Sequence, residues 1–490
     1  THDSWQMAHE KASVSENYGA SYIRDEFARR MHKDMGRLSP MGRFVHVYVD
    51  GRYWGLYNLH ERADAFFMSD HLGGRTEDWD FVCGPENGPG IQLVDGTLEA
   101  WNRMMKLADS GMKTAEKYEA LQEYINIDEF VDYMFAAIWL DHGDWLSIEP
   151  SEWVNRNWIS GRNRDGDGFQ FFIWDLETSM GKHGSLKDLI LAKNLHDGNI
   201  YGNRTRVTGD NSPGRVYHRL RHDNAEFRLR FGDRVQKHLF NDGAMTPKKN
   251  KDRWLELTHE VRDALVAESA RWGGYHKRPD ENKIPIDEPY TRDEFWELEV
   301  NWVEKVWMEK RNQVVIRQLQ EIGLYPMINP PQFSQAGGEV SVGTQLALRG
   351  DGEIYFTMNG SDPRDANSPQ RQIGKTALRY QNPIRLSAGV VQIAARVLND
   401  EEWSALNVLT YKVGLEANLA GNLRVSEIMY HPADEGELDG DRYEFLELEN
   451  TSNLPLDLGG ASFSNGIRYE FDEGSSLGEG KHLVLVRNLE

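Results

Sequence analysis

The sequence predicts a multidomain protein with an α+β portion over its first two-thirds and two all-β sandwich domains after it. Residues 1–326 alternate helical and strand patterns, whereas short strands separated by Gly, Asn, Asp and Pro follow the proline-rich stretch at 326–331. A chain of 490 residues also exceeds what one ordinary core holds. We therefore place domains at 1–326, 327–415 and 420–490, and expect the last to be incomplete because its strand pattern is still running at Glu490.

The composition excludes some classes of function. The net charge of −22 disfavours a general nucleic-acid binder, which presents a basic face to phosphate. The longest apolar run, at 134–140, is far shorter than the roughly 20 residues of a membrane span. The single cysteine, Cys83, allows no intrachain disulfide. A targeting leader is not visible at the start of the sequence, so any signal peptide is expected to lie outside it.

The negative charge is concentrated near the end of the chain. From Gly421 onward there are fifteen Asp and Glu and five Lys and Arg. Their difference, 15 − 5 = 10 negative charges, is nearly half of the net charge of −22. This pattern is typical of a solvated acidic surface. A Ca²⁺-dependent or salt-adapted extracellular module is the alternative interpretation.

Periodicity predicts the elements of the α+β portion. Apolar residues at helical spacing predict helices at 21–35, 100–107, 116–125 and 128–140, and a mostly helical region over 212–324. Two strands over 44–59 flank Asp50-Gly51, a pair that suits a tight turn because both residues tolerate positive φ. Strands at 158–162 and 169–175 flank the loop 163–168, an exposed turn that lacks the twelfth-position Glu of an EF-hand.

Asp175 is the first candidate metal ligand. We expect it to end the apolar strand 169–175, where a carboxylate is open on one side and suits Mg²⁺ or Mn²⁺ with phosphate oxygens. Glu177 would point to the same side if the strand continued, as a second ligand or a support. The alternative is a strand-end Asp that caps the next turn.

The loop after the helix 128–140 carries two further carboxylates, Asp141 and Asp144. Phosphoryl transfer needs a carboxylate that accepts or orients the proton of the acceptor hydroxyl. Asn157 is the candidate for a second metal position. A polar loop without catalytic role is the alternative.

These segments carry a family resemblance. Residues 42–67, reading GRFVHVYVDGRYWGLYNLHERADAFF, resemble the hairpin signature of the CotH kinase family, the spore-coat-type atypical protein kinases. NWISGR at 157–162 and FQFFIWDLE at 169–177 are similar to that family's Asn-bearing strand and its Trp-Asp-Leu-Asp strand. The segments 267–273 and 323–326 also resemble large bacterial members. The resemblance covers roughly 15–326 and implies a kinase-like α+β fold that uses ATP and Mg²⁺ or Mn²⁺.

The resemblance also implies roles. Asp144 matches the catalytic position, with Asp141 as its rival because the loop before Asn157 is long. Asp175 and Asn157 match the metal-binding positions, and Glu177 stands where the family often has Asp. Glu61 matches the acid after the hairpin, which in kinases commonly orients the lysine on the phosphates.

Cys83 departs from the family pattern. The segment 80–84 aligns with one that often ends in Lys-Gly, and a thiol cannot neutralise phosphate charge. Arg62 or Arg162 would have to replace that lysine in cofactor binding, or ATP binding is weak or absent.

The β domains resemble accessory modules of secreted bacterial proteins. Residues 352–363 resemble the chitobiase/hexosaminidase C-terminal β-sandwich, and 425–432 with 443–450 are similar to a lamin-tail domain. The combination implies an exported, extracellular or cell-surface protein kinase acting on Ser or Thr of proteins. The alternatives are a non-catalytic surface or matrix protein whose β modules bind glycan or protein, and a glycan-active enzyme with paired carboxylates.

Overall fold

The computed structural model describes residues 21–85, 90–143, 145–146, 155–166, 168–176, 179–180, 200–273, 291–365, 372–414, 419–434, 436 and 439–486. The chain divides into two compact units. The first comprises Thr1–Asn329 with Trp403–Leu406, and the second comprises Pro330–Glu402 with Asn407–Glu490. The expected fold class is confirmed, because helices and sheets make up the first unit and strands make up most of the second.

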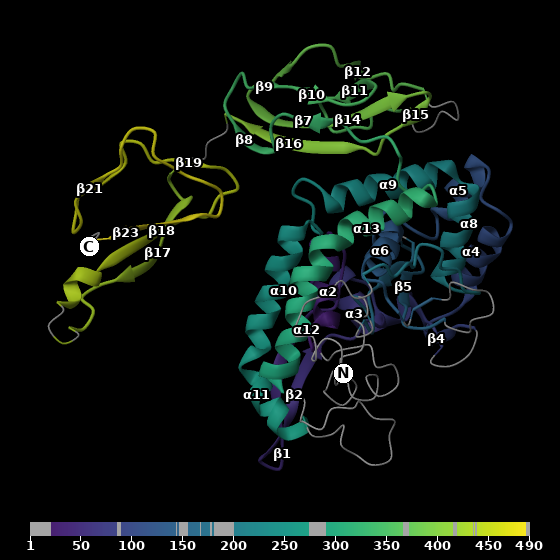
Figure 1. Ribbon diagram of the computed structural model, residues 1–490, viewed down its shortest axis with the longest axis horizontal. Helices are drawn as coiled ribbons and strands as arrows, with labels where there is room; N and C mark the ends of the chain where they lie inside the picture. The colour runs from purple at the N-terminus through teal and green to yellow at the C-terminus, as the bar shows by residue number, and fades with distance from the viewer. Residues whose placement is uncertain are drawn as a thin grey trace. The chain divides into compact units, whose positions relative to one another are not determined.

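The helices and strands of the first unit alternate in its first half, and helices alone follow (Figure 1). The elements of its first half are α2 (Arg24–Asp34), β1 (Gly42–Val49), β2 (Arg52–His60), α3 (Ala65–Leu72), η1 (Thr76–Asp78), β3 (Trp79–Cys83), β4 (Gln92–Asp95), α4 (Glu99–Asp109), α5 (Ala115–Leu121), α6 (Ile127–Trp139), β5 (Ile159–Asn163) and β6 (Gln170–Phe172). The helices that follow are α8 (Pro213–Asp223), α9 (Ala225–Leu239), α10 (Pro247–Arg262), α11 (Ala264–Trp272), η3 (Arg292–Trp296), α12 (Glu297–Trp302), η4 (Val303–Trp307) and α13 (Met308–Glu321).

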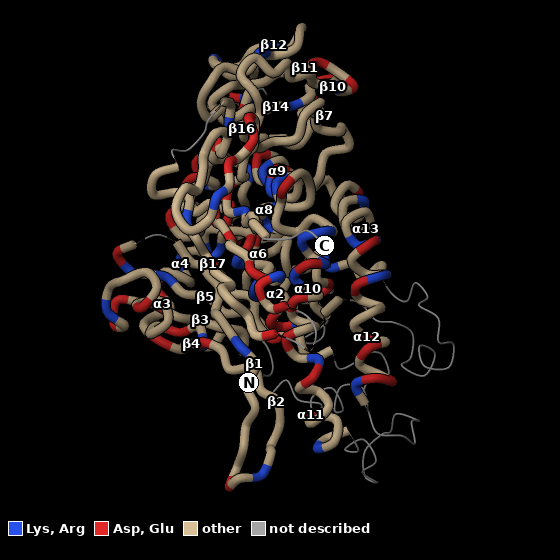
Figure 2. The backbone as a smooth tube through the Cα atoms, turned by 90° about the vertical axis from the view of Figure 1, so that its left-hand side faces the viewer, with Lys and Arg blue, Asp and Glu red and all other residues tan. Residues whose placement is uncertain are grey.

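Strands β1 and β2 form the predicted antiparallel hairpin. Asp50 and Gly51 both have positive φ, 49° and 75°, which is the backbone geometry that the turn needs. The hairpin extends beyond the helices and carries charged residues at its tip (Figure 2). Helix α11 supports it, since the Glu268 carboxylate accepts a hydrogen bond from the Leu56 amide over 2.8 Å and the indole of Trp272 donates to the carbonyl of Trp54 over 2.6 Å.

Strands that follow the hairpin in sequence form a four-stranded antiparallel sheet in the order β4-β3-β5-β6. The hairpin of β5 and β6 confirms the exposed turn at 163–166. The predicted strand at 169–175 was too long, because pairing ends at Phe172. Asp175 therefore lies in the turn after the strand and not at its end, so the reasoning that aligned Glu177 with Asp175 along a strand does not apply.

Helix α6 is the centre of the first unit. Asn126 caps it by accepting hydrogen bonds from the amides of Asp128 and Glu129, and all its residues from Phe130 to Trp139 are buried. A helix that is buried on every side belongs to the core. The predicted helix at 116–125 ends earlier, at Leu121, because the chain leaves the helix to form a bridge between Ile125 and Phe169.

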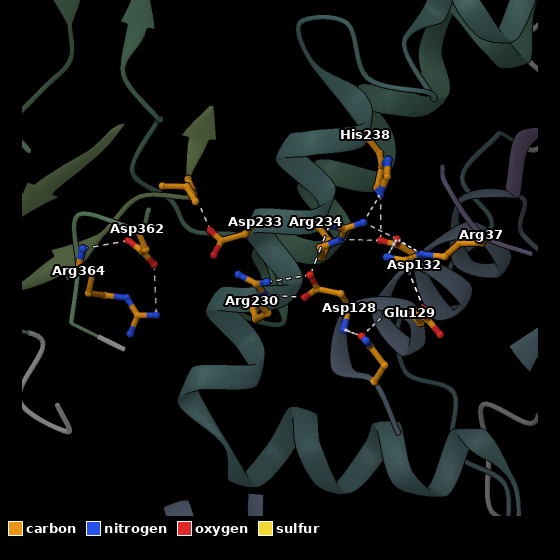
Figure 3. Close-up of polar contacts among 12 residues, drawn as sticks. Arg37, Asp128, Glu129, Asp132, Arg230, Asp233, Arg234, His238, Asp362 and Arg364 are labelled. Carbon is orange, nitrogen blue, oxygen red and sulfur yellow. Dashed lines mark hydrogen bonds and ion pairs between the residues drawn. The ribbon is translucent and has the colours of Figure 1, made fainter. Parts of the chain in front are cut away.

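One carboxylate, Asp132, is enclosed within this core (Figure 3). It pairs with Arg234 and His238 of α9 and with Arg37 after α2, at 2.6–2.9 Å for His238 and Arg37. Burial alone would raise the pKa of Asp132, but these hydrogen bonds and positive charges hold it well below its ordinary range. His32, on α2, is buried beside this group.

The second unit contains two β modules. The strands of the first are β7 (Gln332–Phe333), β8 (Gly338–Val340), β9 (Gln345–Leu346), β10 (Leu348–Arg349), β11 (Glu353–Thr357), β12 (Leu378–Arg379), β13 (Ile384–Arg385), β14 (Gly389–Asn399), β15 (Glu402–Trp403) and β16 (Asn407–Val413). Its main sheet has the order β12-β11-β14-β16-β8, with β15 paired to β14. The β7–β10 and β9–β13 pairs accompany it.

The elements of the last module are β17 (Leu423–Met429), η5 (Gly440–Tyr443), β18 (Phe445–Asn450), β19 (Leu456–Asp457), β20 (Ser462–Phe463), β21 (Tyr469–Glu470), β22 (Ser476–Leu477) and β23 (His482–Val486). Its three-stranded sheet β17-β18-β23 is accompanied by two short strand pairs. Across the described residues of both units, every helix is too short or too polar to cross a membrane.

Candidate active site

Segments that carry the predicted metal ligands reach one edge of the sheet β4-β3-β5-β6. Cys83, the last residue of β3, pairs with Ile159, the first residue of β5, and Ile159 pairs with Phe172, the last residue of β6. Asn157 precedes this edge by two residues and Asp175 follows it by three. The register therefore brings both predicted ligands to the same edge as Cys83.

The loop after α6 joins this edge through two backbone contacts. Leu146 forms an antiparallel bridge with Asn155, just before β5. The amide of Met180, beyond the Asp175 turn, donates a hydrogen bond to the carbonyl of Leu140 over 2.6 Å. The loop 141–146 is thus tied both to the start of β5 and to the turn that follows β6.

Arg204 fixes the same loop from a third direction. Its Nη2 donates to the carbonyl of Gly143 over 2.6 Å and its Nη1 to the carbonyl of Leu146 over 3.4 Å, while its Nε lies 3.9 Å from the carboxylate of Asp141. Gly143 and Leu146 flank Asp144, which lies outside the described residues. One arginine therefore holds the backbone on both sides of the predicted catalytic position.

The carboxylate of Asp141 contacts structural groups. A Cβ at Gly202 would fall 1.6 Å from its Oδ2, so the carboxylate packs directly against this glycine. Burial lowers the pKa of the Arg311 guanidinium to about 10, and the negative charge of Asp141 opposes this effect. Arg311 donates to the carbonyls of Ile138 and Trp139 at the end of α6. Because Asp141 is engaged in these contacts, they favour Asp144, the other aspartate of the loop, for the catalytic role.

Three of the predicted site residues share an uncommon backbone conformation. Asp141, Asn157 and Asp175 have φ values of 52°, 58° and 57°. Asp and Asn tolerate the left-handed region better than other side chains, and such residues gather at functional sites. The conformation supports a site at this sheet edge independently of the register.

Helix α2 holds the turn that carries Asp175. The carboxylate of Asp25 accepts a hydrogen bond from the amide of Leu176 over 3.2 Å, and the guanidinium of Arg24 donates to the carbonyl of Ser179. Asp175 itself is half-buried. A buried helix from the beginning of the chain thus positions a turn about 150 residues later.

Glu61 is engaged at the surface. One carboxylate oxygen accepts a hydrogen bond from the amide of Met41 over 2.8 Å, and the other lies 2.9 Å from Nε2 of His71 on α3. These contacts join the start of the hairpin to the helix after it. The role of Glu61 in cofactor binding stays a prediction.

The two candidate arginines lie in different places. Burial raises the pKa of the Cys83 thiol and the positive charge of Arg62 opposes this, so Arg62 lies near Cys83. Arg162 pairs in register with Asp80, and side chains alternate between the faces of a strand, so it lies on the opposite face of the sheet from Cys83. Its guanidinium is 5.9 Å from the ring of Tyr124. Of the two, Arg62 is the one whose charge acts on Cys83.

Sequence reasoning missed the charged residues of α2. Acidic and basic residues stand together on this helix (Figure 2), and Arg24, Asp25, Glu26 and Arg29 are all buried. The prediction for this helix placed only its apolar residues inside. The available signal was the i, i+4 spacing of Asp25 and Arg29, which pairs acid and base along one face.

The donor set fits a metal–nucleotide complex. Carboxylate and amide oxygens, as in Asp175 and Asn157, are ligands that Mg²⁺ and Mn²⁺ accept. The buried guanidinium of Arg29 pairs with Asp25 and Glu26, and its Nε has no hydrogen-bond acceptor among the described residues, so it can also receive an anion. Glu177, the third predicted ligand, lies outside the described residues.

A separate group of metal-ligand type lies in the last module. Ligand atoms of His431, Asp441 and Glu444 lie within 4.8 Å of one another. Nδ1 of His431 donates a hydrogen bond to the Asp441 carboxylate over 2.6 Å, which raises the pKa of the imidazole.

A kinase-like protein is the class that the family comparison supports. The family model described as CotH kinase protein matches residues 11–315, more than half of the chain, and the chain therefore belongs to the CotH kinase family. The Lamin Tail Domain model matches residues 416–489, in the predicted order. Comparison with curated proteins gives no match. The chitobiase-like nature of the middle module stays a prediction.

Proposed function

We propose that this chain is an exported atypical protein kinase that transfers the γ-phosphate of ATP to Ser or Thr hydroxyls of surface or secreted proteins. The observation that carries the proposal is the meeting of the loop 141–146, Asn157 and the Asp175 turn at one sheet edge in a CotH-family chain. Phosphoryl transfer relies on positioning and charge neutralisation, which such an arrangement provides. The resemblance of the β modules to those of secreted proteins supports export.

The proposed roles follow from the side-chain chemistry. Asp175 and Asn157, with Glu177, would hold the divalent metal, which supplies charge neutralisation on the phosphates when bound. Asp144 accepts the proton of the acceptor hydroxyl, and Asp141 is the alternative base. Arg204 keeps the backbone around these aspartates in place.

The test is transfer of labelled γ-phosphate by the full chain with Mn²⁺ or Mg²⁺, to itself and to a general protein acceptor. Asp175→Asn should abolish transfer, and it is preferable to alanine because asparagine tolerates the positive φ of this position. Asp400→Asn is the matched control, since Asp400 has φ 45° in an exposed turn of the second unit. Transfer by wild type that survives Asp175→Asn would refute these roles.

Cys83 favours a second candidate function, a non-catalytic surface or matrix protein built on a kinase-like scaffold. A thiol at the end of β3 cannot neutralise phosphate, and burial raises its pKa further. The melting temperature with millimolar ATP and Mn²⁺ separates the two candidates. A ligand at 100 times its Kd stabilises the folded state by about 2.7 kcal/mol, so a bound nucleotide gives a clear shift. The absence of both a melting-temperature shift and phosphate transfer would support the non-catalytic scaffold. Its β modules would then bind glycan or protein.

A further inference from the structure

We infer that Arg29 is the cation that holds the nucleotide phosphates at this site, an inference that rests on the proposed function. Arg29 belongs to α2 and pairs with Asp25, four residues earlier on the same helix. Asp25 also accepts the hydrogen bond from the amide of Leu176. The Asp25 carboxylate therefore links Arg29 to the turn that carries Asp175.

The end of β2 defines the other side of Arg29. Burial lowers the pKa of His60, and the positive charge of Arg29 lowers it further, so the imidazole and the guanidinium are neighbours. The ring of His60 also lies 6.0 Å from that of Trp174. The guanidinium thus stands between the strand that leads to Glu61 and the turn at 174–176.

The hydrogen-bonding capacity of Arg29 is only partly met. Its side chain is 1 % exposed, Nη1 contacts the Asp25 carboxylate, and Nη2 lies 3.5 Å from the Glu26 carboxylate. Nε is buried with no hydrogen-bond acceptor among the described residues, and a guanidinium has five N–H groups, so these two ion pairs leave N–H groups unmet. Arg311, equally buried, instead donates to four backbone carbonyls. A native interior rarely leaves such donors unmet unless a ligand meets them.

Phosphate is the ligand that this arrangement fits. A guanidinium offers paired N–H groups that match two phosphate oxygens, and it keeps its charge when buried. Protein kinases use a cation paired with a helix carboxylate for the same task, and here Arg29 with Glu26 on α2 supplies both halves. Arg62 is exposed, so an anion there would gain less. A cation at position 83 is then not needed, because Arg29 of α2 supplies the positive charge.

Binding of Mn²⁺·ADP and of adenosine to the full chain, measured by isothermal titration calorimetry, tests the inference. Arg29→Gln should weaken Mn²⁺·ADP about 10- to 100-fold, which is the loss of a hydrogen bond to a charged group, and leave adenosine binding unchanged. The matched variant Arg62→Gln should weaken Mn²⁺·ADP less than threefold. The double variant Arg29→Gln/Cys83→Lys should regain at least half of the lost affinity on a logarithmic scale.

Each contrary outcome is distinct. If wild type binds Mn²⁺·ADP and Arg29→Gln binds it equally well, or if only Arg62→Gln loses affinity, the role of Arg29 is overturned. The proposed function stands in both cases. Equal weakening of ADP and adenosine overturns it as well, because that marks collapse of the site. No nucleotide binding by wild type overturns the proposed function and this inference together. If Arg29→Gln does not fold, Arg29→Lys decides: it keeps the charge but loses the paired geometry, so ADP binding weakened relative to adenosine supports the role, and an unchanged ratio overturns it.

Discussion

His32 should make the stability of the first unit depend on pH below neutrality. Its imidazole is buried on α2, with 1 % of the residue exposed. Burial lowers the pKa of His32 from 6.5 to about 4, with the charges of Arg37 and His238 adding to the effect and that of Asp132 opposing it. Neither ring nitrogen has a hydrogen-bond partner among the described residues, so the ring behaves as a neutral, apolar core group.

The sign and size of the effect follow from linkage. Because the pKa of His32 is lower in the folded than in the unfolded chain, the unfolded chain takes up the proton first as pH falls. The stability that His32 contributes is therefore complete above pH 6.5 and is lost as pH falls toward 4. At about 1.4 kcal/mol for each pH unit, the whole window amounts to about 3 kcal/mol.

Urea unfolding at several pH values between 7 and 4.5, followed by tryptophan fluorescence, measures this contribution. All fifteen tryptophans lie between residues 5 and 403, so the signal does not come from the last module. The free energy of unfolding of His32→Leu, relative to wild type, should rise by about 2–3 kcal/mol as pH falls across this range. His259→Leu, at an exposed position of α10, controls for the loss of an imidazole. Parallel pH curves for His32→Leu and wild type would refute the reasoning.

Three other substitutions have expected outcomes. Asp132→Asn should destabilise the first unit by about 3–5 kcal/mol in urea unfolding, because its arginine partners stay buried and charged, and a loss below 1 kcal/mol would contradict this. Gly202→Ala should destabilise the first unit by about 1–3 kcal/mol, because its Cβ would fall 1.6 Å from the Asp141 carboxylate, which then has to move; a loss below about 0.5 kcal/mol would show that the carboxylate moves freely. Asp25→Ala should speed hydrogen exchange of the Leu176 amide about tenfold, and unchanged exchange would show that α2 does not hold this turn.

Local sequence chemistry was sufficient for part of the fold. The hairpin β1–β2 was predictable because Asp50-Gly51 selects a tight turn by itself, and the structure places both residues at positive φ. Helix α6 was predictable from its length and apolar periodicity, to within one residue at each end. Both elements are decided by residues adjacent in sequence.

The end of β6 and the interior of α2 were not predictable in this way. The strand stops at Phe172 because the chain turns toward Asp25, about 150 residues earlier. The charges of α2 are buried because Arg24 finds its partners at Ser179 and Glu299, far along the chain. No local pattern contains such partners, so the sequence identified Asp175 as a candidate ligand but not Arg29.

The central claim is that the loop 141–146, Asn157 and the Asp175 turn form one site for a metal–nucleotide complex. Binding of Mn²⁺ in the presence of a non-hydrolysable ATP analogue, followed by electron paramagnetic resonance, tests it most directly. We expect one Mn²⁺ bound per chain in wild type, at least tenfold weaker binding in Asp175→Asn, and unchanged binding in Asp400→Asn. No nucleotide-dependent Mn²⁺ binding in wild type, or equal binding in Asp175→Asn, would contradict the claim.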